Sequence, residues 1–213
     1  MSYNSIFERF ENRIIVYLGL LSINTNPISS VKKIWSTYPS LVSFNSADLV
    51  FKIAPRINAA GRLAHAKIAV EFLLSADGDE KSVFSDIESL NNERKSLDED
   101  ITNEALFQLS KTPATRFTNV VYSPDWHKGV IGIVASRIIE EFYKPTIVFS
   151  GDGDFITGSA RSVKEFDIYE ILNQLKHYFT KFGGHKYAAG LTMKREILEN
   201  FSKDFEKLVA VNM

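Results

Sequence analysis

Four short clusters combine glycine with basic, hydroxyl or imidazole side chains, the groups that bind phosphate in proteins. They are Pro55-Arg56-Ile57-Asn58-Ala59-Ala60-Gly61-Arg62, Trp126-His127-Lys128-Gly129-Val130-Ile131-Gly132, Gly158-Ser159-Ala160-Arg161-Ser162 and Gly183-Gly184-His185-Lys186-Tyr187-Ala188-Ala189-Gly190. Because glycine has no Cβ, the main chain can bring amide donors against an oxyanion where a larger residue would clash. The clusters therefore predict sites for phosphate groups.

The fourth cluster is expected to form a loop in which the amides of Gly183 and Gly184 and the imidazole of His185 converge on one small anion. A strand is expected to follow at 188–193, with small residues that pack beneath the loop. The alternative is an ordinary Gly-Gly turn followed by a surface histidine.

In the third cluster, Ser159 and Arg161 lie two residues apart in a strand expected at 155–161. Alternate residues of a strand point to the same side, so a hydroxyl and a guanidinium would project together. That pair suits the oxygens of a terminal phosphate. The alternative is a surface strand whose arginine forms a salt bridge.

Arg56 and Arg62 are expected to bracket a turn, which Asn58 caps and in which Gly61 takes a left-handed conformation. Both arginines could contact a nucleic-acid backbone, which gives affinity without reading bases. Alternatively, one of the two is structural and anchors the turn onto the sheet domain, and Arg62 is then the preferred contact.

The second cluster precedes an expected helix at 130–142 whose first-turn amides would be free to bind an anion. Trp126 is expected in the core rather than as a stacking platform. His127 is interpreted as a donor to the substrate or as support for a neighbouring metal site. Arg137 could be a phosphate contact or a surface charge of the helix.

The composition is that of a globular protein, with 213 residues, 45% hydrophobic and 24% charged. The absence of cysteine excludes disulfides and thiolate metal sites and fits the cytoplasm. An apolar run at 14–21 is too short to span a membrane, so no membrane partner is expected. The net charge is −1, but residues 76–110 hold 10 acidic and 3 basic side chains, so the rest has a positive excess that permits a basic groove.

Hydrophobic periodicity predicts a mostly helical connector region at 1–111 and an α/β domain at 112–213. The connector has expected helices at 6–21, from Asn26-Pro27, at 45–54 (ended by Pro55), at 68–73 and at 79–109. The second region has expected strands at 119–122, 146–149, 155–161 and 188–193 and helices at 130–142, 168–179 and 195–211. This alternation predicts a mixed β-sheet flanked by helices.

In their order along the chain and in their residues, the four clusters resemble the C-terminal half of the catalytic core of the RecJ family. These proteins are single-stranded-DNA-specific exonucleases of the DHH phosphoesterase superfamily. The resemblance runs from Glu11-Asn12-Arg13 to the last helix, and the Gly-Gly-His stretch resembles the signature of the DHHA1 domain. It implies a DHHA1-like fold, Mn²⁺ or Mg²⁺ in the intact protein, and a 5′→3′ exonuclease acting in DNA repair and recombination. It further implies that the sequence is a fragment that lacks the Asp-His-His metal domain. Such a fragment would bind no metal ion and would be inactive alone.

The resemblance also implies roles for individual residues. His185 would be catalytic, close to the scissile phosphate, while Ser159 and Arg161 would hold the 5′-phosphate end. The other substrate-binding residues would be Arg56, Arg62, His127, Gly183 and Gly184. Expected partners are single-stranded DNA and the missing DHH domain, with a helicase and a single-strand-binding protein as family expectations.

Two other functions stay open from the sequence. One is a DHH phosphodiesterase of short oligonucleotides or cyclic dinucleotides, which shares the Gly-Gly-His region; the segment at 55–62 favours the RecJ family instead. The other is a non-catalytic nucleic-acid-binding scaffold that keeps the fold without nuclease chemistry.

Overall fold

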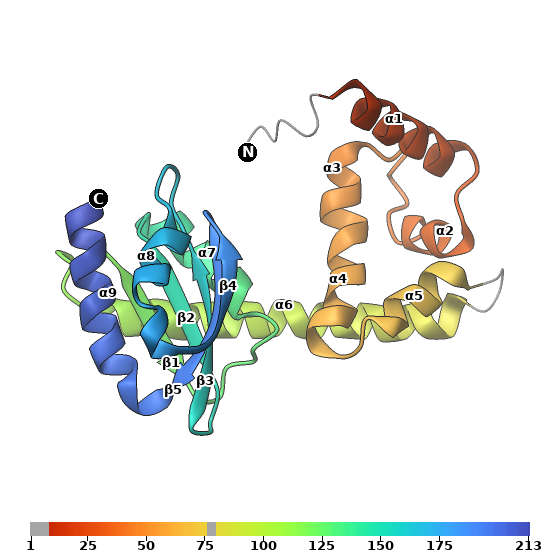
Figure 1. Cartoon of the computed structure of the whole chain (residues 1–213). Coiled ribbons are helices and arrows are strands. Elements are labelled where there is room, and N and C mark those ends of the chain that lie inside the picture. The colour runs from red at the N-terminus through yellow and green to blue at the C-terminus, as the bar shows by residue number, and fades with distance from the viewer. Residues whose placement is uncertain (1–8, 76–79) are drawn as a thin grey trace. The chain divides into compact units, whose positions relative to one another are not determined.

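The computed structural model describes residues 9–75 and 80–213, and the chain divides into two compact units, Met1–Arg94 and Lys95–Met213. The described part of the first unit is helical, and the second unit contains a five-stranded sheet (Figure 1). The predicted α/β fold, a mixed sheet flanked by helices after a mostly helical region, is confirmed. The predicted helix starts at Ile6 and Asp79 lie outside the described residues.

The first unit packs its helices around a small apolar core of Ile34, Phe72, Phe84 and Ile87. Its elements are α1 (Phe10–Thr25), α2 (Ser29–Trp35), α3 (Ser46–Asp48), the π-helix η2 (Leu49–Ile53), α4 (Ala54–Leu63), α5 (Lys67–Leu74) and the start of α6 (Glu80–Ser110). In the part of the chain that the structure describes, no single helix is long and apolar enough to cross a membrane, although α1 and α2 together, bent by 75°, meet the criterion of length and composition.

The turn predicted between Arg56 and Arg62 is wrong, because these residues form helix α4. A proline normally breaks a helix, since it has no amide hydrogen and its ring clashes with the preceding turn. Here the π-helix η2 comes first, and the amide of Ala54 bonds to the carbonyl of Leu49, five residues back. Pro55 therefore falls in the first turn of α4, where a missing amide hydrogen is tolerated.

Arg56 anchors α4 inside the first unit. Its guanidinium bonds through Nε and Nη2 to the carboxylate of Glu88, and through Nη1 to the Tyr38 hydroxyl at 2.8 Å and the Lys52 carbonyl at 2.6 Å. Burial alone would lower the pKa of Arg56, but the hydrogen bonds to Glu88 and Tyr38 outweigh it and raise that pKa. Arg56 is thus structural, but its partners all belong to the first unit and not, as expected, to the sheet domain. Arg62 is exposed on the same helix.

The sheet of the second unit has the order β1-β2-β3-β5-β4, with β1 parallel to β2 and every other pair antiparallel. Its strands are β1 (Asn119–Ser123), β2 (Thr146–Ser150), β3 (Phe155–Arg161), β4 (Phe179–His185) and β5 (Ala188–Lys194). Its helices are α7 (Ile131–Phe142), α8 (Ile168–Gln174) and α9 (Leu198–Asn212), with 3₁₀ turns η3 (Lys176–Tyr178) and η4 (Arg195–Ile197). Helix α7 packs on β2 and β3, and α8 and α9 cover the opposite face (Figure 1).

Strand β4 replaces the end of a predicted helix and the predicted Gly-Gly loop. The helix predicted at 168–179 ends at Gln174, and β4 begins at Phe179. A β-bulge between Phe179 and Lys181 lets Phe179 and Phe182 pack against the same core. Their spacing of three residues therefore has the period of a helix, although the backbone is extended.

The C-terminal half of α6 belongs to the second unit. The Trp126 indole donates to Glu104 at 2.7 Å, and the Gln108 side-chain amide bonds to both the carbonyl and the amide of Tyr122. Ile101, Ala105 and Leu109 are buried along the same helix. The compact unit thus begins within α6, and the domain boundary between 111 and 112 stays a prediction.

We expect Arg56→Ala to lower the free energy of unfolding by about 1–3 kcal/mol, because it removes the donors that satisfy Glu88 and the Lys52 carbonyl. Asn58→Ala, at an exposed position of the same helix, should not lower it. Urea unfolding followed by circular dichroism measures both. Equal losses in the two variants would contradict the anchoring role of Arg56.

Candidate functional site

One side of strands β3, β5 and β4 forms an exposed polar surface, which we call the open face. Residues directly opposite each other in an antiparallel pair point to the same side of the sheet. The register therefore defines the open face as Phe155, Thr157, Ser159 and Arg161 of β3, Ala188, Gly190, Thr192 and Lys194 of β5, and Lys181, Gly183 and His185 of β4. The other side carries the core residues Ile156, Ala160, Leu191 and Met193.

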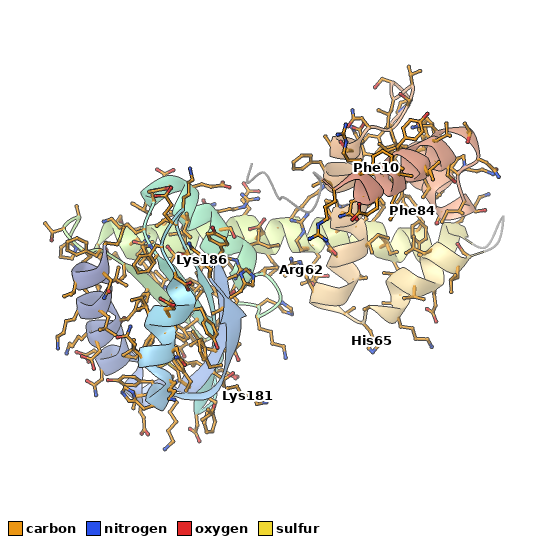
Figure 2. All side chains as sticks on the ribbon, turned by 45° about the horizontal axis from the view of Figure 1, so that its top comes forward. Phe10, Arg62, His65, Phe84, Lys181 and Lys186 are labelled. Atoms are coloured by element: carbon orange, nitrogen blue, oxygen red, sulfur yellow. The ribbon has the colours of Figure 1, made fainter. Side chains whose placement is uncertain are left out.

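The open face contains no carboxylate, although Asp and Glu make up 26 of the chain's residues. Its cations are Arg161, Lys181 and Lys194. Lys181 and Lys186 lie toward opposite ends of β4, with Lys186 in the turn after the strand (Figure 2). The surface is thus suited to an anionic ligand that follows the sheet.

The register arranges the predicted site residues in two cross-strand rows. Arg161, Ala188 and His185 form one row, and Ser159, Gly190 and Gly183 form the next. Neighbouring strands lie about 4.8 Å apart, so the two outer backbones of a row are about 10 Å apart. The predicted residues of the third and fourth clusters are therefore brought together across a floor of small residues.

Helix α7 begins directly over Ser159 and Arg161. The Arg161 guanidinium donates to the Ser159 hydroxyl at 3.0 Å and to the Ala160 carbonyl at 2.8 Å. A Cβ placed on Gly132, in the first turn of α7, would lie 2.7 Å from the guanidinium and 3.0 Å from the hydroxyl oxygen. Only glycine lets the helix start approach this pair so closely.

The start of α7 and the Arg161 side chain are both positively charged. A helix N-terminus carries a partial positive charge, and the Arg161 guanidinium is held beside it. An anion bound beside both would be attracted by both and would offset their mutual repulsion. The Ser159 hydroxyl accepts from Arg161, so its own hydrogen can be donated to that anion.

His185 is exposed at the end of β4, and its orientation is fixed by the turn that follows. Its Nδ1 accepts a hydrogen bond from the amide of Tyr187 at 3.3 Å. A nitrogen that accepts carries no proton, so this hydrogen bond assigns the neutral imidazole proton to Nε2. His185 can therefore donate a hydrogen bond to an anion from Nε2.

The loop predicted at the Gly-Gly-His stretch is wrong, because these residues pair as a strand, and its two glycines differ in role. A Cβ on Gly184 would lie 2.4 Å from the Ala188 carbonyl oxygen and 2.5 Å from the Ala189 Cα, so the hairpin needs this glycine. A Cβ on Gly183 or on Gly190 would meet no atom within 4 Å. Packing within the fold does not explain those two glycines, whereas close approach of a ligand backbone would.

The residues of the second cluster have distinct positions. Trp126 is buried, as expected of a core residue. His127 is half-buried, and its Nδ1 accepts from the Gly129 amide at 3.1 Å, so its Nε2 is also assigned the proton. Arg137 lies 2.8 Å from the buried carboxylate of Asp98, so its guanidinium joins α7 to α6.

Arg56 and Arg62 lie in the first unit, on α4, so the structure does not bring them into the cross-strand rows. Sequence reasoning missed Gly190 and Lys181 as neighbours of the site. Gly132 was part of the second cluster, but its contact with Ser159 and Arg161 was not predicted. The spacing of two residues between Ala188 and Gly190 indicated that both point to the same side of the strand. The strands that pair with this one could not be identified from the sequence.

The described residues do not fit a resident metal ion. Within the ranges 9–75 and 80–213, no three His, Cys, Asp or Glu side chains come together in a way that could hold one. The donors of the open face are a guanidinium, a hydroxyl and an imidazole, which suit an anion rather than Mn²⁺ or Mg²⁺.

The chain is similar to known proteins in both sequence and fold. The DHHA1 domain family matches residues 116–211, which include every strand of the open face. The chain is similar to the single-stranded-DNA-specific exonuclease RecJ of Bacillus subtilis, at 36% identity over 190 residues, which covers 87% of this chain and 24% of that protein. Its similarity to RecJ of Haemophilus influenzae is 34% over 212 residues, covering 93% of this chain and 37% of that protein.

Solved structures show the same fold. RecJ from Thermus thermophilus in complex with Mg²⁺ is similar with a TM-score of 0.84 and 30% identity, covering 93% of this chain and 31% of that one. A structure of exonuclease RecJ bound to manganese gives a TM-score of 0.79 at 30% identity, covering 93% of this chain and 50% of that one. The chain thus spans about a quarter to a third of the length of the curated relatives it matches.

We expect Gly184→Ala to lower the free energy of unfolding by about 2 kcal/mol or more, because the new methyl group would overlap main-chain atoms of β5. Gly183→Ala and Gly190→Ala should leave it within about 0.5 kcal/mol, since both positions are open. Thermal unfolding of the three variants measures this. A large loss of stability at Gly183 or Gly190 would mean that those glycines serve the fold and not a ligand.

Proposed function

Because this chain is a RecJ-like region that contains a DHHA1 domain, we propose that its open face binds single-stranded DNA and holds the 5′-phosphate end. The observation that carries the proposal is the convergence of Ser159, Arg161 and the first turn of α7 on one point. It combines a planar donor group, a hydroxyl and a helix N-terminus, which together match a terminal phosphate.

Ser159 and Arg161 bind this terminal phosphate. It has one more ionisable oxygen than the phosphates within a strand, so it gains more from a guanidinium that stays charged at all physiological pH values. Gly132 lets the first turn of α7 lie directly against the pair. A free 5′-hydroxyl end would make one fewer charge-assisted contact here and should bind less tightly.

His185 and Gly183 contact the next phosphate along the strand. Imidazole Nε2 donates a directed hydrogen bond, and Gly183 lets the sugar–phosphate backbone approach the sheet. In the nuclease reaction His185 would stand beside the scissile phosphate and stabilise the charge that develops on its oxygen atoms. Gly184 contributes indirectly, by allowing the hairpin that presents both residues.

Arg62 and His127 are proposed as further contacts to the DNA backbone, and Arg56 as a residue that positions Arg62 by holding α4. Contacts of this kind recognise phosphate and not bases, so binding should be independent of sequence and sensitive to salt.

The chemistry of cleavage is proposed to need residues other than those described. The relatives include RecJ structures in complex with Mg²⁺ or bound to manganese, whereas the described residues offer no cluster of metal ligands. We propose that the intact protein is a metal-dependent 5′→3′ exonuclease in cytoplasmic DNA repair and recombination. In it a DHH domain would supply the metal ions, with a helicase and a single-strand-binding protein as partners. This chain would grip the strand.

We expect the chain to bind a 5′-phosphorylated single-stranded oligonucleotide about 5- to 20-fold more tightly than the same oligonucleotide with a 5′-hydroxyl, because one charge-assisted contact is lost. Arg161→Ala should abolish this preference. Fluorescence anisotropy across a salt series measures it. Lys207→Ala, on the exposed side of α9 and outside the open face, is the matched control and should keep the preference.

A preference that survives in Arg161→Ala, or binding that is equal for the two ends in the wild-type chain, would place end recognition elsewhere. Gly132→Ala offers a second route to the same pocket, since its methyl group would push against the guanidinium and the hydroxyl. It should reduce the preference without removing either donor.

We also expect the purified chain to leave single-stranded DNA uncleaved when Mn²⁺ or Mg²⁺ is added, because the open face has no carboxylate to hold the ion. Product analysis of a 5′-labelled oligonucleotide over a metal titration tests this. Release of mononucleotides that is stopped by a chelator would contradict it.

A further inference from the structure

The open face continues beyond the two rows used above. The next row contains Thr157, Thr192 and Lys181, and the one after it contains Phe155 and Lys194. Alternate residues of a strand are about 6.8 Å apart, so Phe155 lies about 20 Å from Arg161 along β3. Gly190, Thr157 and Lys181 are exposed between these ends.

The first added row resembles a phosphate contact. Lys181 is exposed and has no carboxylate partner in the part of the chain that the structure describes. Its opposite neighbours on the open face are two threonines, whose hydroxyls are short hydrogen-bond donors. This row lies about 6.8 Å from Ser159 along β3. Its cation and two hydroxyls would suit the sugar–phosphate backbone of a nucleic-acid strand that leaves the end pocket.

The second added row resembles a base platform. Phe155 is 51% exposed, so the face of its ring is accessible to a ligand on the polar sheet surface. It borders a hollow of about 410 Å³ that is also lined by Asp154, Lys194, Arg195 and Glu196. The positive charges of Lys194 and Arg195 balance the negative charges of Asp154 and Glu196. Lys194 and Glu196 form an ion pair at 3.2 Å. A nearly neutral hollow beside an aromatic ring suits an uncharged base better than a phosphate.

We infer that the open face is a continuous track for single-stranded nucleic acid, with Lys181 binding a phosphate and Phe155 stacking a base several nucleotides from the bound end. The inference rests on the proposed function, because the end pocket at Ser159 and Arg161 sets where the track begins. It assigns a binding role to residues outside the four glycine-containing clusters. Because every base has a flat face, stacking on Phe155 tolerates any sequence.

The test compares two lengths of 5′-phosphorylated oligothymidylate, a dinucleotide and an octanucleotide, binding to the full 213-residue chain. Both fill the end pocket, but only the octanucleotide reaches Phe155. Amide NMR titration detects weak binding and also maps it, and circular dichroism checks that each variant is folded. The variants are Phe155→Ala, Lys181→Gln and the control Lys207→Gln on the opposite side of the sheet.

For the octanucleotide, Phe155→Ala should weaken binding about 5- to 150-fold, the range that loss of one base–aromatic stack gives. The dinucleotide should bind the wild-type chain and Phe155→Ala equally. Lys181→Gln should reduce the slope of log affinity against log salt by about 0.7 for the octanucleotide, since it removes one phosphate contact to a single strand. Lys207→Gln should change none of these values.

The track is overturned if Phe155→Ala and Lys181→Gln bind the octanucleotide as the wild-type chain does, or if the amide signals of Phe155 and Lys194 stay unperturbed at saturation. Loss of the 5′-phosphate preference would instead overturn the end pocket. In that case, octanucleotide-specific perturbation of Phe155 and Lys181 would still support the track. If a protein partner and not nucleic acid occupies this surface, Phe155→Ala and Lys181→Gln should bind the octanucleotide as the wild-type chain does.

Discussion

The antiparallel register of β3, β5 and β4 is the constraint on which the site depends. It puts Arg161 opposite Ala188 and Ala188 opposite His185, so three segments of sequence contribute to one exposed surface. Side chains alternate between the two sides of a strand, and a slip of one residue would turn Arg161 and His185 into the core. The phosphate-binding arrangement is therefore a property of strand pairing and not of any single motif.

The opposite side of the sheet holds this register in place. A Cβ on Gly158 would lie 2.6 Å from the Phe149 ring, and Phe149 meets Phe201 edge to face, so β3 is tightly matched to its neighbours there. At the hairpin tip, the amide of Ser162 bonds to the Tyr187 carbonyl at 3.0 Å, which ties the end of β3 to the turn after His185. The core side thus needs close packing, whereas on the open side a Cβ added to Gly183 or Gly190 would meet no atom within 4 Å. This difference separates stability from binding.

Much of the fold follows from the sequence, because β1, β2, β3 and β5 are short runs of β-branched, aromatic and small residues and α7 and α9 have clear helical periods. Strand β4 could not be predicted from the sequence, because its bulge gives Phe179 and Phe182 the spacing of a helix. The π-helix before Pro55 was equally hidden, because proline alone indicates a helix end. For the site, the residue types at Ser159, Arg161 and His185 could be singled out, but their neighbours could not, since cross-strand partners are set by tertiary packing.

The account's central claim is that a terminal phosphate binds to Ser159 and Arg161 of β3, beside the start of α7. The most direct measurement is a crystal structure of the chain with a 5′-phosphorylated dinucleotide. The account predicts the terminal phosphate within hydrogen-bonding distance of the Ser159 hydroxyl and the Arg161 guanidinium, beside Gly132, with the second phosphate toward His185. A phosphate bound on the side covered by α8 and α9, or anywhere outside the open face, would contradict it.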